Sequence, residues 1–307
     1  MSKIAFIYPG QGAQAVGMGQ DFYENSPLSK VVFDQASEAV SLDLKKLCFE
    51  ENDLLNKTEY TQVAMVTACI AMTRAVEAMG LHADMTAGLS LGEYCAIAAA
   101  GGMCDMDAVR TVRSRGIFME HAAPEGTGAM SAVLGLDASV IEEVLDGREG
   151  VSIANYNCPG QIVITGQAEA VAKAGEALKE AGARRVLPLK VSGPFHSAML
   201  KGAGDKLEKE LKNIELKELK MPYVANCNAS YIYDNSQIKE LLKKQISAPV
   251  KFMQSVEKMI DDGVDTFVEI GPGKTLSKFV KKINKDVTVI NIEKVDDLEK
   301  LKGLEIC

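Results

Sequence analysis

The stretch "ADMTAGLSLGEYCAIAAAGG", residues 83–102, sets a serine between two glycines at the end of an apolar run. Residues 83–89 are typical of a buried strand, and the residues after Ser90 are typical of a helix. A chain that passes from strand to helix through G-x-S-x-G turns so sharply that only small residues fit at Gly88 and Gly92. The turn presents the serine at a helix N-terminus, where free N–H groups stabilise developing negative charge. Ser90 is therefore a candidate nucleophile, and a glycine-flanked helix cap is the alternative.

Strand and helix patterns alternate over much of the chain. Further strands are predicted at residues 3–8, 265–270 and 287–292, and helices at residues 61–80, 106–122 and 274–284. This alternation predicts an α/β fold with a mainly parallel sheet, and the glycine-flanked serine makes the domain hydrolase-like.

Residues 126–192 follow a different order, in which two strands come in succession. The patterns predict strand, helix, strand, strand, helix and strand, with residues 157–160 as the turn between the central strands. This β-α-β-β-α-β order is that of a ferredoxin-like subdomain. We therefore expect a large catalytic domain formed by residues 1–125 and 193–307, with the small subdomain inserted into it. Such an insertion leaves a cleft, which is a common place for a ligand site.

The composition argues against several classes of protein. The 307 residues carry a formal net charge of −8, which disfavours nonspecific binding of nucleic acid. Seven cysteines without a C-x-x-C pair indicate reduced thiols rather than disulfides or a zinc site. No apolar run approaches the ~20 residues of a membrane span, and a strand starting at residue 3 leaves no room for a signal peptide. We expect a soluble, cytoplasmic protein that binds neither nucleic acid nor membranes.

A nucleophilic serine needs a base within hydrogen-bond reach, and the chain has three histidines. His82 precedes the strand that ends at Ser90, so it lies about 26 Å away at the other end of the sheet. His121 ends a helix, where it interacts with the helix dipole or with solvent. His196 follows a strand and opens a helix after Pro194, at the kind of junction where catalytic groups gather in α/β folds. His196 is therefore the candidate base, and a structural histidine is the alternative.

The group that orients the imidazole is not evident from the residues. Glu269, at the end of the strand predicted at residues 265–270, is one possibility. A backbone carbonyl is the other, and both remain open.

An arginine lies on the apolar stripe of a predicted helix. Ala108, Val112, Arg115 and Met119 share one face at helical spacing, while the neighbouring arginines point elsewhere. An unpaired buried charge is costly, so Arg115 requires an anion. That anion is either an internal carboxylate such as Glu93 or the carboxylate of a substrate held by the guanidinium fork.

Two glycine-rich segments resemble nucleotide-binding loops but lack what such loops require. The loop "GQGAQA", residues 10–15, would bind a dinucleotide only if a second strand ended in an acidic residue about 20 residues later. The nearest such residue, Asp34, lies in a helical pattern. In "GPGKT", residues 271–275, the first glycine of a phosphate-binding loop falls on Val268. We expect neither NAD nor ATP binding.

Seven motifs occur in a fixed order along the chain: "FIYPGQGAQ", "GLSLGEYCAIAAAG", "VRSRGIFM", "NYNCPGQIVITG", "GPFHSAML", "QISAPVKF" and "VEIGPGKTL". With these motifs essentially the whole chain resembles the malonyl-CoA:acyl carrier protein transacylases of bacterial fatty acid synthesis. It also resembles the acyltransferase domains of polyketide synthases.

The resemblance implies a role for each candidate. Ser90 would take the malonyl group from CoA as an ester, with His196 as general base and then general acid. Arg115 would hold the malonyl carboxylate. The backbone N–H groups of Gln11 and Leu91 would form the oxyanion hole.

The resemblance also implies roles for three residues that the patterns alone do not identify. Gln245 would supply the backbone carbonyl that orients His196, which accounts for the missing acid. Phe195 suits malonyl, because family members that accept methylmalonyl have a smaller residue there. Leu89 departs from the family pattern, since many relatives have histidine at this position, and the departure bears on the polarity of the pocket.

The partners implied by the resemblance are malonyl-CoA and an acyl carrier protein, with no metal and no redox cofactor. Carrier proteins of these pathways are acidic, so a basic patch at Lys274, Lys278, Lys281 and Lys282 is a candidate docking surface, with an ordinary solvated helix face as the alternative. Two other functions fit the serine motif less well: a serine esterase or thioesterase, and a catalytically silent scaffold.

Overall fold

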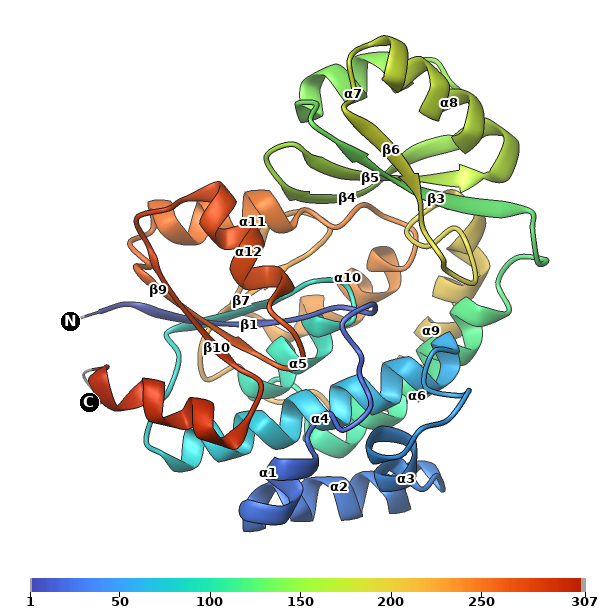
Figure 1. Cartoon of the computed structure of the whole chain (residues 1–307). Coiled ribbons are helices and arrows are strands. Elements are labelled where there is room, and N and C mark those ends of the chain that lie inside the picture. Colours follow the sequence, from blue (N-terminus) through green and yellow to red (C-terminus); the bar gives the residue numbers. More distant parts are fainter. Residues whose placement is uncertain (1, 305–307) are drawn as a thin grey trace.

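The computed structural model describes residues 2–304, which form two β-sheets surrounded by helices (Figure 1). The larger sheet has the strand order β10-β9-β1-β2-β7-β8, and its neighbours are parallel except for β7 and β8. Its strands are β1 (Ile4–Tyr8), β2 (Met85–Gly88), β7 (Tyr223–Ala225), β8 (Ser230–Ile232), β9 (Thr266–Ile270) and β10 (Thr288–Ile292). The expected α/β fold with a mainly parallel sheet is confirmed.

Both faces of the larger sheet are covered by apolar side chains. Ile4, Phe6 and Tyr8 of β1 belong to one hydrophobic layer, whereas Ala5 and Ile7 belong to the other. Strands buried on both faces are apolar at nearly every position, which is why they appear in the sequence as continuous apolar runs.

Most helices contribute to the first of these layers. They are α1 (Gln20–Asn25), α2 (Pro27–Val40), α3 (Leu44–Phe49), α4 (Thr58–Ala78), α5 (Gly92–Ala99), α6 (Asp105–Glu120), α9 (Lys201–Leu211) and α10 (Ile238–Gln245). The second layer is formed with α11 (Phe252–Asp261) and α12 (Thr275–Ile283). Among residues 2–304, no helix is long and apolar enough to cross a membrane.

The smaller sheet has the order β4-β5-β3-β6 and is antiparallel throughout. Its elements follow the expected β-α-β-β-α-β order: β3 (Gly128–Leu134), α7 (Ala138–Leu145), β4 (Val151–Cys158), β5 (Gln161–Gln167), α8 (Ala168–Glu180) and β6 (Arg185–Pro188). Helices α7 and α8 cover its outer face, away from the larger sheet (Figure 1). Met130, Ala132 and Val163 from its inner face join the large core.

Main-chain hydrogen bonds join the smaller sheet to a connecting segment of the larger part of the molecule. The Tyr156 N–H donates to the Val250 carbonyl at 2.9 Å, and the Val250 N–H donates to the Ala154 carbonyl at 2.8 Å. Strand β4 is thereby fixed against the segment that joins α10 to α11.

Two segments differ from the sequence-based expectations. The last strand of the subdomain pattern, "RRVLPLKV" at residues 184–191, is shorter than the sequence indicates: β6 ends at Pro188, although the Leu189 N–H still donates to the Met130 carbonyl at 2.9 Å. His196 was expected to open a helix, and this is wrong. Its φ of 61° lies in the left-handed region, and α9 begins only at Lys201, after a short 3₁₀ turn.

Candidate active site

Ser90 lies at a sharp turn between β2 and α5, as the glycine pattern predicts. Its φ is 53°, an unusual value for a residue with a side chain. A Cβ at Gly92 would overlap the carbonyl of Tyr8, and a Cβ at Gly88 would overlap the backbone of Gly92. The strand and the helix can therefore approach closely only because both positions are glycine.

Asn226, which directly follows β7, holds this turn from the neighbouring strand. Its Oδ1 accepts a hydrogen bond from the Ser90 N–H at 2.6 Å, and its Nδ2 donates to the Gly88 carbonyl at 2.6 Å. The sequence analysis did not identify Asn226. The signal available was a polar residue at the end of the apolar segment "YVA", and that signal is weak in a strand of three residues.

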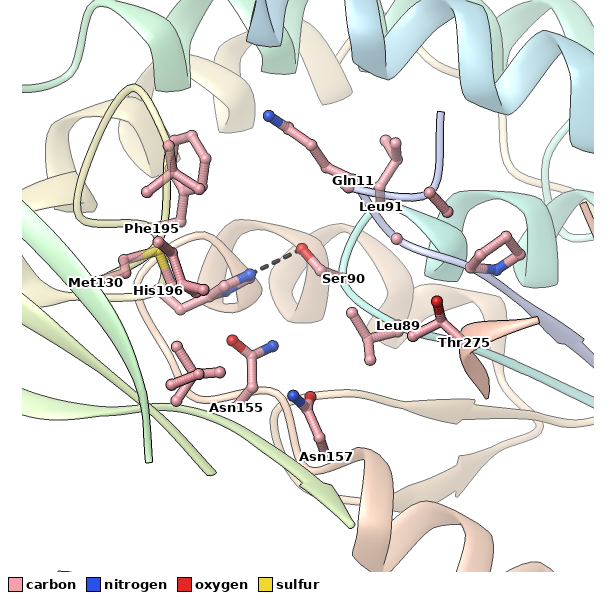
Figure 2. A pocket seen from close by; sticks show the side chains of 18 of the residues that line it. Gln11, Leu89, Ser90, Leu91, Met130, Asn155, Asn157, Phe195, His196 and Thr275 are labelled. Carbon is pink, nitrogen blue, oxygen red and sulfur yellow. Dashed lines mark hydrogen bonds between the residues drawn. The ribbon is translucent and has the colours of Figure 1, made fainter. Parts of the chain in front are cut away.

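His196 lies beside Ser90 and is 4% exposed. Its Nε2 is 2.7 Å from the Ser90 Oγ (Figure 2), and its Nδ1 is 2.8 Å from the Gln245 carbonyl. A carbonyl can only accept, so Nδ1 carries the proton and Nε2 is the acceptor for the serine hydroxyl. The geometry is that of a serine–histidine pair whose ring is oriented by a backbone carbonyl.

The surroundings keep this imidazole neutral. Burial and the nearby Arg115 charge lower the pKa of His196 to about 4, although hydrogen bonds to backbone carbonyls oppose the shift. A neutral imidazole is the form that can accept the serine proton.

Arg115 projects from α6 to the same place and is 1% exposed. Its Nη1 donates to Gln62 Oε1 at 2.8 Å, and its Nη2 donates to Gln245 Oε1 at 2.9 Å and to Ser90 Oγ at 3.2 Å. All three acceptors are uncharged, and no ion pair within residues 2–304 includes Arg115. Burial lowers the pKa of Arg115 from its usual range, which reflects a cation without a directly bound anion.

Gln245, the last residue of α10, connects the other groups. Its backbone carbonyl accepts from His196, and its side-chain oxygen accepts from Arg115. Its Nε2 donates to the Ser90 carbonyl at 2.9 Å and to Glu93 Oε2 at 2.6 Å. Glu93 is therefore linked to Arg115 through Gln245 rather than by direct contact. Burial raises the pKa of Glu93 to about 7, against the lowering effect of its hydrogen bonds.

Gln11 and Leu91 lie together on one side of Ser90 (Figure 2). Gln11 is in the loop after β1, and its side chain donates to Thr58 Oγ1 at 3.0 Å. Within residues 2–304, no hydrogen bond is formed by the backbone N–H of either Gln11 or Leu91. Both N–H groups are thus available to a group at Ser90.

A cavity of about 330 Å³ adjoins these residues. Leu89, Met130 and Phe195 form apolar parts of its wall, and other lining residues come from β4, from β5 and from the start of α12. Ser90, His196, Arg115, Gln11 and Leu91 all line it. The cavity therefore lies between the two sheets, with the nucleophile candidate at its wall.

Several alternatives from the sequence lie elsewhere. His82 and His121 are exposed. Glu269 accepts hydrogen bonds from the backbone N–H groups of Leu276 and Ser277 at the start of α12, at 3.0 and 2.8 Å, so it caps that helix and does not orient His196.

The lysines of the candidate docking patch and the described cysteines take part in none of the hydrogen bonds given above for the site. The lysines of the candidate docking patch are exposed around α12; they are Lys274, Lys278, Lys281 and Lys282. Among residues 2–304, no group of three or more His, Cys, Asp or Glu side chains is arranged to hold a metal ion, and the six described cysteines are free.

Comparison with known proteins identifies the family. Residues 5–300 match the acyl transferase domain model. A Bacillus subtilis relative named malonyl CoA-acyl carrier protein transacylase is 46% identical over 304 residues, which cover 97% of this chain and 96% of the relative.

Solved structures give the same result. The malonyl CoA-acyl carrier protein transacylase from Clostridium perfringens has a TM-score of 0.95 and 46% identity, covering 98% of this chain and 96% of that one. A type II PKS acyl-carrier protein in complex with its malonyl-transacylase gives a TM-score of 0.92 and 38% identity over 97% of this chain and 98% of that one. The chain is therefore an acyltransferase, and it belongs to the family of malonyl CoA-acyl carrier protein transacylases.

Proposed function

We propose that this chain transfers the malonyl group of malonyl-CoA to the phosphopantetheine thiol of an acyl carrier protein, as a step of fatty acid synthesis. The observation that carries the proposal is the hydrogen-bonded series from Ser90 through His196 to the Gln245 carbonyl, with Arg115 against the serine oxygen. The names of the relatives and the neighbouring complex with an acyl-carrier protein supply the substrates.

In the first half-reaction, the Ser90 oxygen attacks the thioester carbonyl while its proton passes to Nε2 of His196. The hydrogen bond from Nδ1 to the Gln245 carbonyl holds the ring in the tautomer that can accept this proton. When the tetrahedral intermediate collapses, the C–S bond breaks and the proton on Nε2 moves to the CoA sulfur. The products are free CoA and a malonyl ester on Ser90.

In the second half-reaction, the carrier thiol follows the same path in reverse. It gives its proton to His196, attacks the ester carbonyl, and displaces the Ser90 oxygen, which takes the proton back. The mechanism is therefore ping-pong. No electrons are exchanged, so the scheme requires no redox cofactor, and every proton transfer in it is assigned to Ser90, His196 or a substrate thiol.

Two features would stabilise the charges that arise. The N–H groups of Gln11 and Leu91 would bind the negative oxygen of the tetrahedral intermediate. The Arg115 guanidinium would bind the malonyl carboxylate, and this anion would compensate a charge that now has only neutral partners. The Phe195 ring would limit the size of the acyl group at the cavity wall.

The proposal is tested by following the ester directly. Wild-type protein incubated with malonyl-CoA alone should release one equivalent of CoA and carry one malonyl group on the Ser90 peptide, detected by mass spectrometry. Addition of a holo carrier protein should remove that group and load the carrier. Ser90→Ala should show neither event, and a malonyl group on any other residue would contradict the mechanism.

The same experiment separates transfer from hydrolysis. A thioesterase built on the same turn would release free malonate at a rate that does not depend on the carrier protein. Transfer predicts that the Ser90 ester persists without a carrier and that malonate appears slowly relative to carrier loading.

A further inference from the structure

Glu93 is a buried carboxyl group in the first turn of α5, close to the candidate nucleophile, and is 1% exposed. Its Oε2 accepts hydrogen bonds from Gln245 Nε2 at 2.6 Å and from the Asn226 N–H at 3.3 Å. Both of these residues also bind the backbone of Ser90. Within residues 2–304, the Glu93 Oε1 is buried and has no hydrogen-bond partner. The proposed mechanism gives no role to this carboxyl group.

The Glu93 oxygen helps to determine how the Gln245 amide is oriented. The NH₂ side of the amide faces two acceptors, Glu93 Oε2 and the Ser90 carbonyl. Its oxygen side therefore faces the Arg115 guanidinium and accepts from Nη2 at 2.9 Å. The reverse orientation would set acceptor against acceptor on one side and donor against donor on the other, which is costly in a buried site. Glu93 thus acts on Arg115 through Gln245.

The charge of Glu93 affects how strongly Arg115 can bind an anion. A carboxylate one amide away from the guanidinium would attract it and would repel a second carboxylate bound to it. A neutral carboxyl group leaves the guanidinium with uncharged partners. Burial raises the pKa of Glu93 to about 7, although its hydrogen bonds to Gln245 and Asn226 and the Arg115 charge oppose the shift. The neutral acid is therefore the main form below about pH 7.

We propose that Glu93 is a positioning residue for acyl selection: it orients Arg115 through the Gln245 amide and, as a neutral acid, leaves the guanidinium charge to the malonyl carboxylate. The inference rests on the proposed function, because it takes Arg115 to bind that carboxylate. Ionisation of Glu93 weakens the binding of malonyl and leaves acyl groups without a carboxylate unaffected. The preference for malonyl therefore depends on pH.

The titratable groups around this carboxyl group keep their charge state near neutral pH. Arg115, from α6, remains a cation. Burial raises the pKa of Tyr94 on α5 and of Tyr223 on β7 further above neutral, and it raises the pKa of Cys227 to about 11. The pKa of His196 is lowered to about 4, so its ring is neutral. A change in acyl preference near pH 7 is thus the signature of the buried acid.

The test compares malonyl-CoA with acetyl-CoA as donors to Ser90 between about pH 6 and about pH 8.5. Both donors release the same thiol and use the same serine and histidine, so the ratio of their kcat/KM values reports recognition of the carboxylate. In the wild type this ratio should fall by about 10-fold as the pH rises through 7, the order expected for two like charges separated by one side chain. The ratio is independent of the fraction of correctly folded enzyme.

Two variants separate the charge of Glu93 from its hydrogen bond. Glu93→Gln keeps an acceptor oxygen but cannot ionise, so its ratio should stay near the low-pH value of the wild type at every pH. Glu93→Leu removes the acceptor and should lower the ratio by about 3- to 10-fold at low pH, the effect of losing one hydrogen bond. Glu93→Gln carries the test alone if the leucine variant does not fold.

Glu59→Gln is the matched control, because it removes a carboxylate beside a different arginine of α6. Glu59 contacts Arg113 at 3.2 Å, and neither residue lines the cavity. The ratio in this variant should follow that of the wild type at every pH.

Three results would overturn the inference while leaving the proposed function intact. The first is a wild-type ratio that does not change with pH. The second is an equal fall with pH in Glu93→Gln, which would assign the titration to another group. The third is a wild-type ratio in folded Glu93→Leu at low pH. A wild-type protein that places no malonyl group on Ser90 would instead overturn the proposed function, and this inference with it.

Discussion

The guanidinium of Arg115 is unusual because it is buried among neutral acceptors. Gln62, Gln245 and Ser90 satisfy three of its N–H directions, while its Nε has no partner within residues 2–304. The face of Tyr94 lies 5.4 Å from its Cζ and adds a weak cation–π contact. None of these groups neutralises the charge, so the guanidinium can still form a charge–charge interaction with an anionic ligand.

We expect Arg115→Ala to reduce the preference for malonyl over acetyl donors. Losing one charge-assisted interaction corresponds to ~2–4 kcal/mol, or about 30- to 1,000-fold in relative kcat/KM. The measurement is Ser90 acylation from a panel of acyl-CoAs. Arg113→Ala is the control on the same helix, because Arg113 contacts Glu59 at 3.2 Å and does not line the cavity. Unchanged discrimination in Arg115→Ala would refute the carboxylate role.

At this scale the sequence identified side chains better than it identified main-chain groups. Ser90 stands out because two glycines flank it at the end of a strand, and Arg115 stands out because it lies on an apolar helix face. His196 follows from elimination among three histidines. The carbonyl of Gln245 has no such signal, since every residue has a carbonyl. Glu269 looked suitable as an acid at a strand end, but its carboxylate caps a helix instead.

The element on which the site depends is the turn between β2 and α5, packed on β1. Gly92 lies against the backbone of Tyr8, and Gly88 lies against Gly92 itself. Backbone atoms cannot move aside as a flexible side chain can, so a methyl group at either position must displace a strand or a helix.

Gly92→Ala should therefore lower the free energy of unfolding, by about 1–3 kcal/mol or more. Gly202→Ala in α9 is the control, because a Cβ there meets no atom within 4 Å. It should stabilise the protein by about 0.5–1 kcal/mol, since alanine favours the helix over glycine. Chemical denaturation measures both. Equal stabilities of the two variants would show that the turn is not closely packed.

The elements with a continuous apolar run or a clear helical period were predicted best. Helices α4 and α6 and strands β1, β9 and β10 lie within two or three residues of the expected bounds. Strands β7 and β8 have three residues each, too few to show any periodicity. The bulge in β4 was not foreseen either, because alternation predicts a regular strand and a bulge appears only in the pairing with β5.

The pH dependence of folding involves the molecule as a whole, because Glu93 sits where α5, α10 and the segment after β7 meet. Burial raises its pKa to about 7 from a usual value of 4.5. The folded state therefore retains a proton that the unfolded state loses. The stability that neutral Glu93 contributes is complete below pH 4.5, declines as the pH rises, and is lost above about pH 7. The lowered pKa of His196 acts in the opposite sense, with stability lost as the pH falls from about 6.5 toward 4.

Glu93→Gln should remove the first of these contributions and leave the second. Relative to the wild type, the variant should gain about 3 kcal/mol in the free energy of unfolding between pH 4.5 and 7, with no further change above that range. Urea denaturation across this pH range measures the difference. A difference that does not vary with pH would show that Glu93 titrates normally.

Local pattern was sufficient to predict the two classes of sheet, the turn at Ser90, and the residue types of the nucleophile, base and cation. This succeeds because strand and helix periodicity, glycine requirements and buried charge are properties of short segments. The family resemblance implied which of these groups act together, but only the folded chain shows their contacts. Ser90 meets His196 across 106 residues, and Arg115 meets Gln245 across 130. A short segment cannot show which distant residue its side chains will contact. Many polar groups look alike in their local sequence, and the packing of distant elements decides which of them meet. Asn226 was placed in this way, whereas the Gln245 carbonyl was expected from the family resemblance and not from any local pattern.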